Sequence, residues 1–344
     1  MRHPIDPVFL HPIQVNMRCK PALHSGVRSA LAAILVFAVA HFATPVKAEF
    51  TPDPSIVPYS GPLFDAMAQT DETLDGNAMY ATAKAAGVTR MALFARIHRR
   101  HDGSALVDHL AAAHPDFFIV GAPKYFDMRD DLDASFVSST RREISSGHAR
   151  FVGEILYSHG DKEGGEVTAT GERYIDPTRP NTAKLLTALK GKQIPFMAHW
   201  EVYDWERDWP RFHKLYEEFP QQIFILPHAG LGSAEQLAYI MQLHPNVWAT
   251  LSKREHGSSS LRDEDKAEDV GPSVIDRHGR LRPEWRDVMI RFHDRLMFAT
   301  DCHNADRWPQ YREITVIWRQ ILAQLPPDVA QEIAYGNAVR LYGK

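Results

Sequence analysis

The sequence contains little cysteine and no apolar run long enough to cross a membrane. Only two of its 344 residues are cysteine, Cys19 and Cys302, which is too few for the disulfide framework of a small secreted domain. The most apolar run, residues 30–40, is well short of the roughly 20 residues that span a bilayer. The chain must therefore rely on a hydrophobic core, and its length suits one large α/β domain.

That short apolar run lies in an N-terminal stretch typical of a secretory signal. Arg18, Lys20 and Arg28 precede it, and Val46-Lys47-Ala48 places small residues where a signal peptidase reads. We therefore expect residues 1–48 to be a signal peptide, with Met17 as an alternative start. The mature protein is then periplasmic or secreted. An uncleaved amphipathic anchor is the competing interpretation.

The sequence also lacks an excess of positive charge. Residues 1–48 hold five Lys/Arg and one Asp, a net charge of +4, so the formal charge of −4 becomes −8 after cleavage. An acidic mature chain is not expected to bind nucleic acid. No later segment is apolar enough to span a membrane, so the expected partner is a small-molecule substrate. Homo-oligomerisation stays open.

Short apolar runs alternate with helical patterns from residue 63 onwards. Eight runs read as strands: 63–69, 88–95, 117–123, 150–157, 194–201, 223–230, 247–252 and 296–301. Their spacing of roughly 33 residues is the length of one strand-plus-helix unit. Eight such units predict a single-domain (β/α)8 TIM barrel over residues 49–344. Segment 158–171 is expected to be a long loop, and 253–279 an excursion over the barrel mouth.

An open, doubly wound α/β sheet is the alternative fold. Such sheets usually carry a glycine-rich phosphate-binding turn after the first strand. Here that place holds Thr70-Asp71-Glu72. The closed barrel is therefore favoured.

Four polar side chains lie at or near the C-terminal ends of the expected strands: Glu154, His199, His228 and Asp301. In a closed barrel these ends meet at one mouth. Two imidazoles and two carboxylates suit a divalent transition metal such as zinc, with a position left for water. Asp301 could accept the proton of that water. Each residue also has a purely structural alternative, such as pairing of Glu154 with Arg96.

The order of these motifs resembles a known family. The segments V-G-E-I, H-W-E, P-H-A-G and A-T-D, followed by the terminal I-A-Y-G-N-A-V-R-L-Y-G, resemble the amidohydrolase superfamily over about residues 60–344. The likeness is greatest to its amidohydrolase-2 branch of metal-dependent hydrolases and decarboxylases, which are (β/α)8 barrels. The resemblance implies that Glu154, His199 and His228 are metal ligands and that Asp301 is the catalytic acid–base.

The sequence departs from this family in its first strand. That strand normally ends in Asp-x-His-x-His, whose histidines hold the more buried of two metals, whereas here it reads Asp65-Ala66-Met67-Ala68-Gln69. A thioether and a neutral amide are poor substitutes for imidazole. We therefore expect one divalent metal ion rather than two, with zinc favoured and manganese as the alternative.

Residues in the loops around the mouth complete the candidate site: Arg96, His159, Tyr203 and His303 are expected to bind substrate. The leading hypothesis is an exported hydrolase in which a metal-bound hydroxide attacks an ester, lactone or amide carbonyl. A decarboxylase of aromatic acids is one alternative, suggested by the basic residues after the second strand and the aromatics near Tyr203. A periplasmic, metal-free binding protein or pseudoenzyme is the other, suggested by the missing first-strand histidines.

Overall fold

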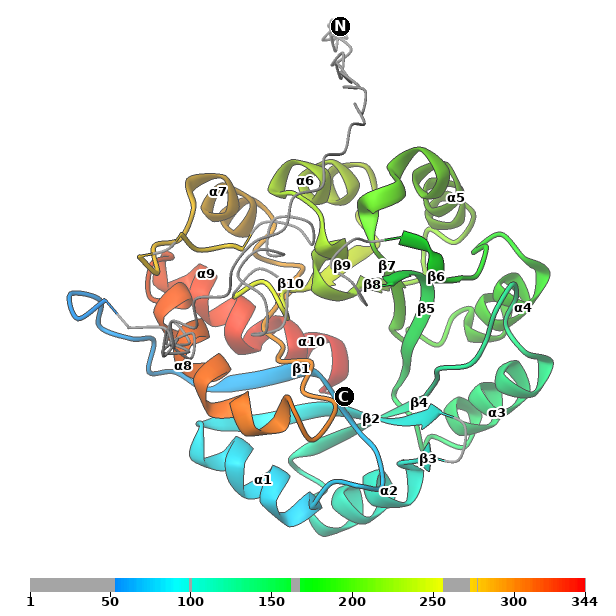
Figure 1. The fold of residues 1–344 in the computed structure, drawn as a ribbon, viewed down its shortest axis with the longest axis horizontal. Coiled ribbons are helices and arrows are strands. Elements are labelled where there is room, and N and C mark those ends of the chain that lie inside the picture. The colour runs from blue at the N-terminus through cyan, green and yellow to red at the C-terminus, as the bar shows by residue number, and fades with distance from the viewer. Residues whose placement is uncertain (1–52, 99–100, 162–167, 256–272, 277, 344) are drawn as a thin grey trace, which may run out of the picture. The chain divides into compact units, whose positions relative to one another are not determined.

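The computed structural model describes residues 53–98, 101–161, 168–255, 273–276 and 278–343. Eight parallel strands form a ring with helices around it (Figure 1). The strands follow one another in chain order: β1 (Leu63–Thr70), β2 (Val88–His98), β4 (Phe118–Tyr125), β5 (Phe151–Asp161), β7 (Phe196–Trp200), β8 (Phe224–Leu226), β9 (Val247–Thr250) and β10 (Leu296–Met297). This ring confirms the predicted (β/α)8 barrel. The expected signal peptide and most of the 253–279 excursion lie outside the described residues.

Backbone hydrogen bonds between β1 and the segment after β10 close the ring. The donor–acceptor pairs are Ala66 N to Phe298 O at 3.0 Å, Asp301 N to Met67 O at 2.9 Å and Gln69 N to Cys302 O at 2.8 Å. β10 itself ends at Met297, earlier than the predicted strand 296–301. The chain nevertheless continues beside β1 and carries Asp301 to the C-terminal end of the ring.

Helices cover the outside of the ring: α1 (Gly76–Ala85), α2 (Ser104–Ala113), α3 (Ala134–Ser145), α4 (Pro180–Leu189), α5 (Trp205–Glu218), α6 (Ala234–Leu243), α7 (Pro283–Arg291) and α8 (Tyr311–Leu322). Local signals explain several of their ends. Ser233 and Gln236 form a capping box at the start of α6. Gly87, with φ of 76°, lies just beyond α1 in the left-handed conformation that ends helices.

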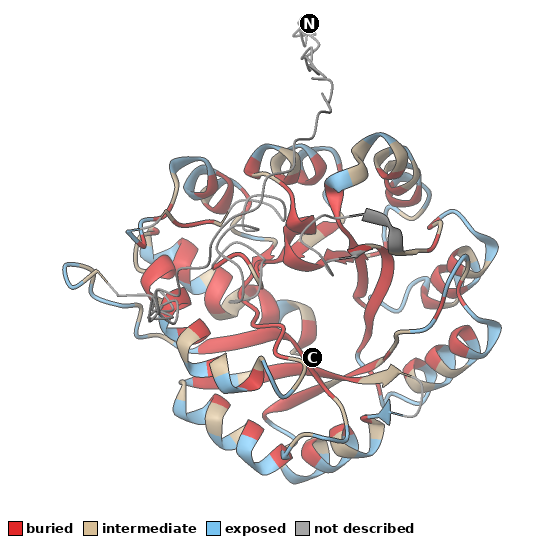
Figure 2. Cartoon of the chain, in the orientation of Figure 1, coloured by how far each residue is buried: buried red, intermediate tan, exposed pale blue. Residues whose placement is uncertain are grey.

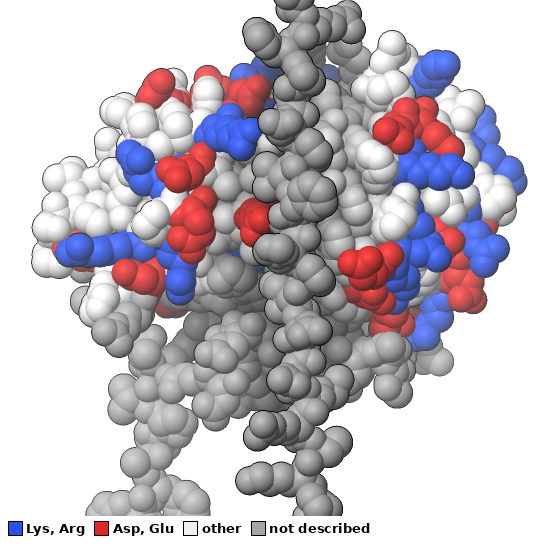
Figure 3. Space-filling view, turned by 90° about the horizontal axis from the view of Figure 1, so that it is seen from above, with Lys and Arg blue, Asp and Glu red and all other residues white. Residues whose placement is uncertain are grey.

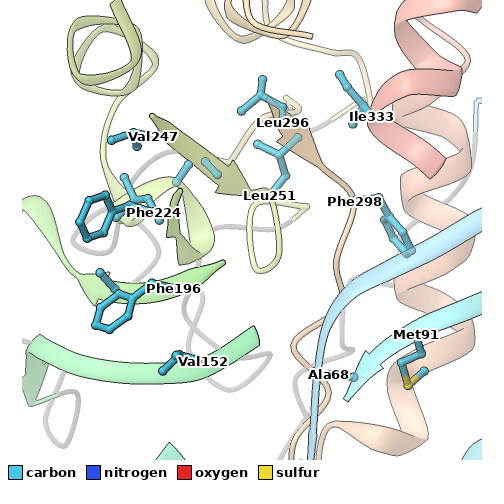
Figure 4. Close-up of a cluster of buried hydrophobic side chains, with 14 of the residues drawn as sticks. Ala68, Met91, Val152, Phe196, Phe224, Val247, Leu251, Leu296, Phe298 and Ile333 are labelled. Carbon is cyan, nitrogen blue, oxygen red and sulfur yellow. The ribbon is translucent and has the colours of Figure 1, made fainter. Parts of the chain in front are cut away.

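Strand side chains alternate between the inside of the ring and the layer under the helices. On β7, Phe196, Ala198 and Trp200 belong to the outer cluster, whereas Met197 belongs to the inner one. Figure 4 shows part of the outer layer, where Phe196 lies beside Phe224 of the next strand. Figure 2 shows strands buried along their length and helices exposed on their outer side. Burial on both faces is why the strands read as unbroken apolar runs.

The chain's last helical segment closes the N-terminal end of the ring. It comprises α9 (Pro327–Gln331), a π-helical turn η5 (Glu332–Gly336) and α10 (Asn337–Tyr342). The Tyr342 ring lies 5.9 Å from that of Phe64 and 5.0 Å from that of Phe151, measured between centroids. The opposite end, where the strands terminate, is therefore the mouth.

The segment 158–171 is not simply the long loop that its polar composition predicts. β5 runs on to Asp161, and β6 (Thr168–Tyr174) pairs with it in antiparallel fashion. A shorter strand, β3 (His101–Asp102), pairs with β2 in the same way. Both pairings are made by backbone groups at the rim of the barrel. The apolar pattern of the sequence therefore does not predict them.

The surface of the described residues is charged but mixed in sign. Figure 3 shows Lys and Arg side chains interspersed with Asp and Glu over the face that it draws. Among the described residues, every helix is too short or too polar to cross a bilayer.

Candidate metal centre

A β-bulge directs Glu154 into the barrel mouth. Pairing between β5 and β7 shifts register between Val152 and Ile155. Phe151 lies in the inner cluster, so strict alternation would turn a residue three positions later outward. The extra residue at the bulge restores the inward direction at Glu154.

Glycine is required at this bulge, and similar irregularities occur on two other strands. A Cβ at Gly153 would lie 2.3 Å from the Ala122 carbonyl oxygen, which is far inside van der Waals contact. The register also shifts on β1 before Ala68 and on β4 before Lys124. Bulges of this kind commonly re-aim side chains next to functional sites.

Glu154, His199 and His228 meet in the mouth as a buried cluster. Glu154 Oε1 lies 2.7 Å from His199 Nδ1 and 3.5 Å from His228 Nε2. One potential ligand atom from each residue lies within 4.8 Å of the other two. One carboxylate and two imidazoles are a donor set that zinc and similar ions accept. The three residues therefore fit a single divalent ion.

His228 is held in place by a strained backbone and by two hydroxyl groups. Residues 228–231 all have φ between 52° and 66°, the left-handed region that non-glycine residues rarely adopt. The His228 backbone N–H donates to Thr250 Oγ1 at 3.2 Å, and Nδ1 lies 2.8 Å from Ser252 Oγ. The contact at Nδ1 leaves Nε2 directed at Glu154. A second partner of this kind is what orients a metal-binding imidazole.

Asp301 lies at the edge of the cluster and is fully partnered. Its Oδ1 accepts from Gln69 Nε2 at 2.5 Å, and its Oδ2 lies 2.8 Å from Lys253 Nζ. The same Oδ2 is 3.9 Å from His228 Nε2. Burial acts to raise the pKa of Asp301, but Lys253 and His303 hold it well below its ordinary value. Asp301 is therefore ionised at neutral pH.

Opposed effects also set the protonation states of Glu154, His199 and His228. Burial acts to raise the pKa of Glu154, but Lys124 and His199 hold it well below its usual range. Burial acts to lower the pKa of His199, yet the Glu154 carboxylate raises it. Burial lowers the pKa of His228 to about 4. His228 is therefore neutral at pH 7, the state in which an imidazole can bind a metal.

Three charged residues of the centre are absent from the sequence-based prediction. Lys124 of β4 contacts Glu154 Oε2, and Lys253 contacts Asp301. Glu201 Oε1 lies 3.2 Å from His199 Nε2. The sequence could have indicated Glu201, since this residue follows His199 by two positions in the motif H-W-E. Nothing in the sequence indicated the two lysines, because a lysine that follows an apolar run is ordinarily solvated.

Three of the four expected substrate-binding residues adjoin the cluster. Arg96 Nη1 donates to the His303 carbonyl oxygen at 2.9 Å, and His303 Nδ1 lies 2.7 Å from the Asp301 carbonyl oxygen. The His159 ring stacks on that of His199 with centroids 5.3 Å apart. The Arg96 pairing proposed as a structural role for Glu154 is not formed, because Glu154 contacts Lys124 instead.

Tyr203, the fourth expected residue, lies further out. Its hydroxyl donates to Glu172 of β6, and 40% of the residue is exposed. Arg207 of α5 binds the same Glu172 carboxylate through both of its terminal nitrogens. These contacts brace β6 against α5, and a role of Tyr203 in substrate binding stays a prediction.

Asp65 of β1 links this strand to the segment that carries Asp301. Its carboxyl group accepts hydrogen bonds from the Thr300 backbone N–H at 3.0 Å, Thr300 Oγ1 at 2.6 Å and the Tyr311 hydroxyl at 3.0 Å. Burial raises the pKa of Asp65 to about 6. Asp65 therefore supports the site without facing it.

Comparisons with known proteins agree with this fold. A family model described as amidohydrolase matches residues 139–344, more than half of the chain. A search of curated proteins found no match. An uncharacterized TIM-barrel protein from Bordetella bronchiseptica superposes with a TM-score of 0.53 at 16% identity, covering 77% of this chain and 81% of that one. A probable 2-pyrone-4,6-dicarboxylic acid hydrolase from Acinetobacter baumannii, with citric acid bound, gives 0.52 at 11% identity, covering 82% and 99%. The chain belongs to the amidohydrolase superfamily, in its amidohydrolase-2 branch.

Proposed function

We propose that this chain is a metal-dependent hydrolase that cleaves an ester, lactone or amide, with zinc as its ion. The observation that carries the proposal is the buried cluster of Glu154, His199 and His228 with the ionised Asp301 beside it. A divalent ion held there supplies Lewis acidity, which polarises a carbonyl group and lowers the pKa of water from near 16 towards about 7. Two nitrogens and one oxygen are a donor set that favours zinc.

Asp301 is the proposed acid–base. Lys253 and Gln69 fix the direction of its carboxylate, so that Oδ2 is presented to the side of His228. Asp301 accepts one proton from the attacking water while the water oxygen bonds to the carbonyl carbon. It then returns that proton to the departing alcohol or amine as the bond between the carbon and the leaving group breaks. The low pKa of Asp301 makes its carboxylate a weak base. Such a base suits a water molecule whose own pKa has been lowered.

The proposed path of the substrate runs over Arg96, His159 and His303. These residues surround the cluster on the side of Asp301 and His199. Their side chains offer N–H donors to the polar groups of a substrate held against the mouth. Tyr203 is proposed to contact only the outer part of a large substrate.

A metal-free binding protein on the same barrel is the second candidate. The observation that favours it is charge balance: the Lys124 ammonium group pairs with Glu154 and that of Lys253 with Asp301. The two carboxylates are therefore neutralised by the protein itself.

Metal analysis separates these two candidates. Protein purified without chelator, and again after incubation with zinc or manganese chloride, is expected to hold one ion per chain by elemental analysis. His199→Ala and His228→Ala are expected to lose the ion together with hydrolysis of a panel of esters and lactones. His213→Ala, a histidine on α5 that contacts His244 instead, is the matched control and should keep both. Wild-type protein that takes up no ion would refute the hydrolase proposal and favour the binding protein.

We further propose that the protein is exported. Support comes from the basic residues, apolar run and small residues that precede position 49. Mass spectrometry of the protein recovered from the periplasm or medium is expected to find a mature chain that begins at Glu49. Recovery of the intact leader in the cytoplasm would refute export.

A further inference from the structure

The two carboxylate oxygens of Glu154 face different kinds of partner. Oε1 faces the imidazoles, at 2.7 Å from His199 Nδ1 and 3.5 Å from His228 Nε2. Oε2 faces N–H groups instead. It contacts Lys124 Nζ, and it lies 3.4 Å from Gln69 Nε2. One oxygen of Glu154 can therefore bind an ion, while the other is already occupied by the protein.

Lys124 is built into this position. Its side chain is 6% exposed, against 2% for Glu154, and its Nζ lies 5.1 Å from the centroid of the Phe126 ring. Burial lowers the pKa of Lys124, and charge attraction from Glu154 and Asp301 acts against this effect. A buried ammonium group is stable only with such counter-charges, and the aromatic face adds to them. Lys124 is thus a fixed cation close to both carboxylates.

Gln69 bridges the same two carboxylates. Its Nε2 donates to Asp301 Oδ1 at 2.5 Å and lies 3.4 Å from Glu154 Oε2. Turning the amide over would place its oxygen against two anionic oxygens, so the N–H side is held inward. Gln69 Oε1 is buried and has no hydrogen-bond partner among the described residues.

We propose that Lys124 and Gln69 keep a divalent ion out of the gap between Glu154 and Asp301, so that the mouth admits an ion only at Glu154 Oε1, His199 and His228. The proposal rests on the proposed function for the ion that is admitted, but the exclusion itself needs no activity. A second ion in the gap would meet the Lys124 charge and would have to displace the Gln69 N–H from both carboxylates. Two carboxylates without Lys124 would instead offer the hard oxygen ligands that manganese accepts.

The test compares manganese content in three forms of the mature protein. Each is incubated with manganese chloride, desalted, and measured by elemental analysis and electron paramagnetic resonance. Wild-type protein is expected to hold one manganese ion per chain with the spectrum of isolated ions. Lys124→Met is expected to hold one ion more than wild type, with the two ions magnetically coupled. Lys253→Met is the matched control. It removes the ammonium group beside Asp301 but leaves Lys124 and Gln69 in place, so it should hold the same number of manganese ions per chain as wild type.

The outcomes separate this proposal from the proposed function. Wild-type protein without any ion refutes the proposed function, while an ion that Lys124→Met gains and still holds when His199→Ala is added supports exclusion. Lys124→Met with no more ion than wild type overturns the exclusion, and so does a coupled two-ion spectrum in wild type. Lys124→Gln, a milder change that keeps an N–H donor but no charge, is expected to gain an ion in the same way and serves if Lys124→Met does not fold.

Discussion

Replacement of Asp65 by asparagine should change how the stability of this barrel depends on pH. Asp65 is fully buried and accepts hydrogen bonds from Thr300 and Tyr311. Burial raises its pKa from 3.8 to about 6 in the folded protein. Between these two values the native state binds more protons than the unfolded state. Stability contributed by Asp65 is therefore present at low pH and falls as the pH rises through this window.

The size of this fall follows from the shift. One pKa unit corresponds to about 1.4 kcal/mol, so a shift of roughly two units is worth about 3 kcal/mol in full, of which about 2.4 kcal/mol is lost between pH 4 and pH 7. Asparagine resembles the protonated carboxyl group in shape and cannot ionise. It disturbs the hydrogen bonds from the Thr300 and Tyr311 hydroxyls, at a cost of about 1–3 kcal/mol that does not vary with pH.

Urea unfolding followed by tryptophan fluorescence measures the effect. The free energy of unfolding of Asp65→Asn, minus that of wild type, is expected to rise by about 2.4 kcal/mol from pH 4 to pH 7. Taking this difference removes the contributions of the other titrating groups. Asp116→Asn, at an exposed position, is the matched control and should stay within about 0.5 kcal/mol of wild type. A difference for Asp65→Asn that is the same at both pH values would refute the reasoning.

Three further predictions concern the site. Ser252→Ala removes the hydroxyl beside His228 Nδ1 and is expected to weaken zinc binding by about 10–100-fold in competition with a chromophoric chelator; unchanged affinity would contradict the role of Ser252. Asp301→Asn should lower the turnover of a hydrolysed ester by about 10²–10⁴-fold while the ion content stays constant, and retained turnover would exclude Asp301 as the acid–base. Gly153→Ala places a Cβ 2.3 Å from the Ala122 carbonyl oxygen, so its free energy of unfolding should fall by about 1–3 kcal/mol in urea; a neutral effect would show that the bulge can adapt.

The barrel could be predicted because its strands are buried on both faces. Apolar runs such as 194–198 then stand out against the polar helices, and their number and spacing define the ring. The prediction was least accurate where apolar burial does not operate. β6 is polar and pairs through its backbone, and β10 is shorter than its apolar run because the chain after Met297 follows β1 irregularly.

The sequence by itself determined the barrel and the four residues Glu154, His199, His228 and Asp301, because each is a polar residue within or at the end of an apolar run and parallel strands end at one mouth. It also determined that the first strand offers a thioether and an amide in place of two imidazoles. Only the tertiary structure decided what fills the space beside them. Gln69 reaches Asp301 across 232 positions of sequence, and Lys124 is buried against Glu154 only because a bulge turns it inward. Contacts between such distant residues depend on ring closure and local register, which hydrophobic periodicity does not encode.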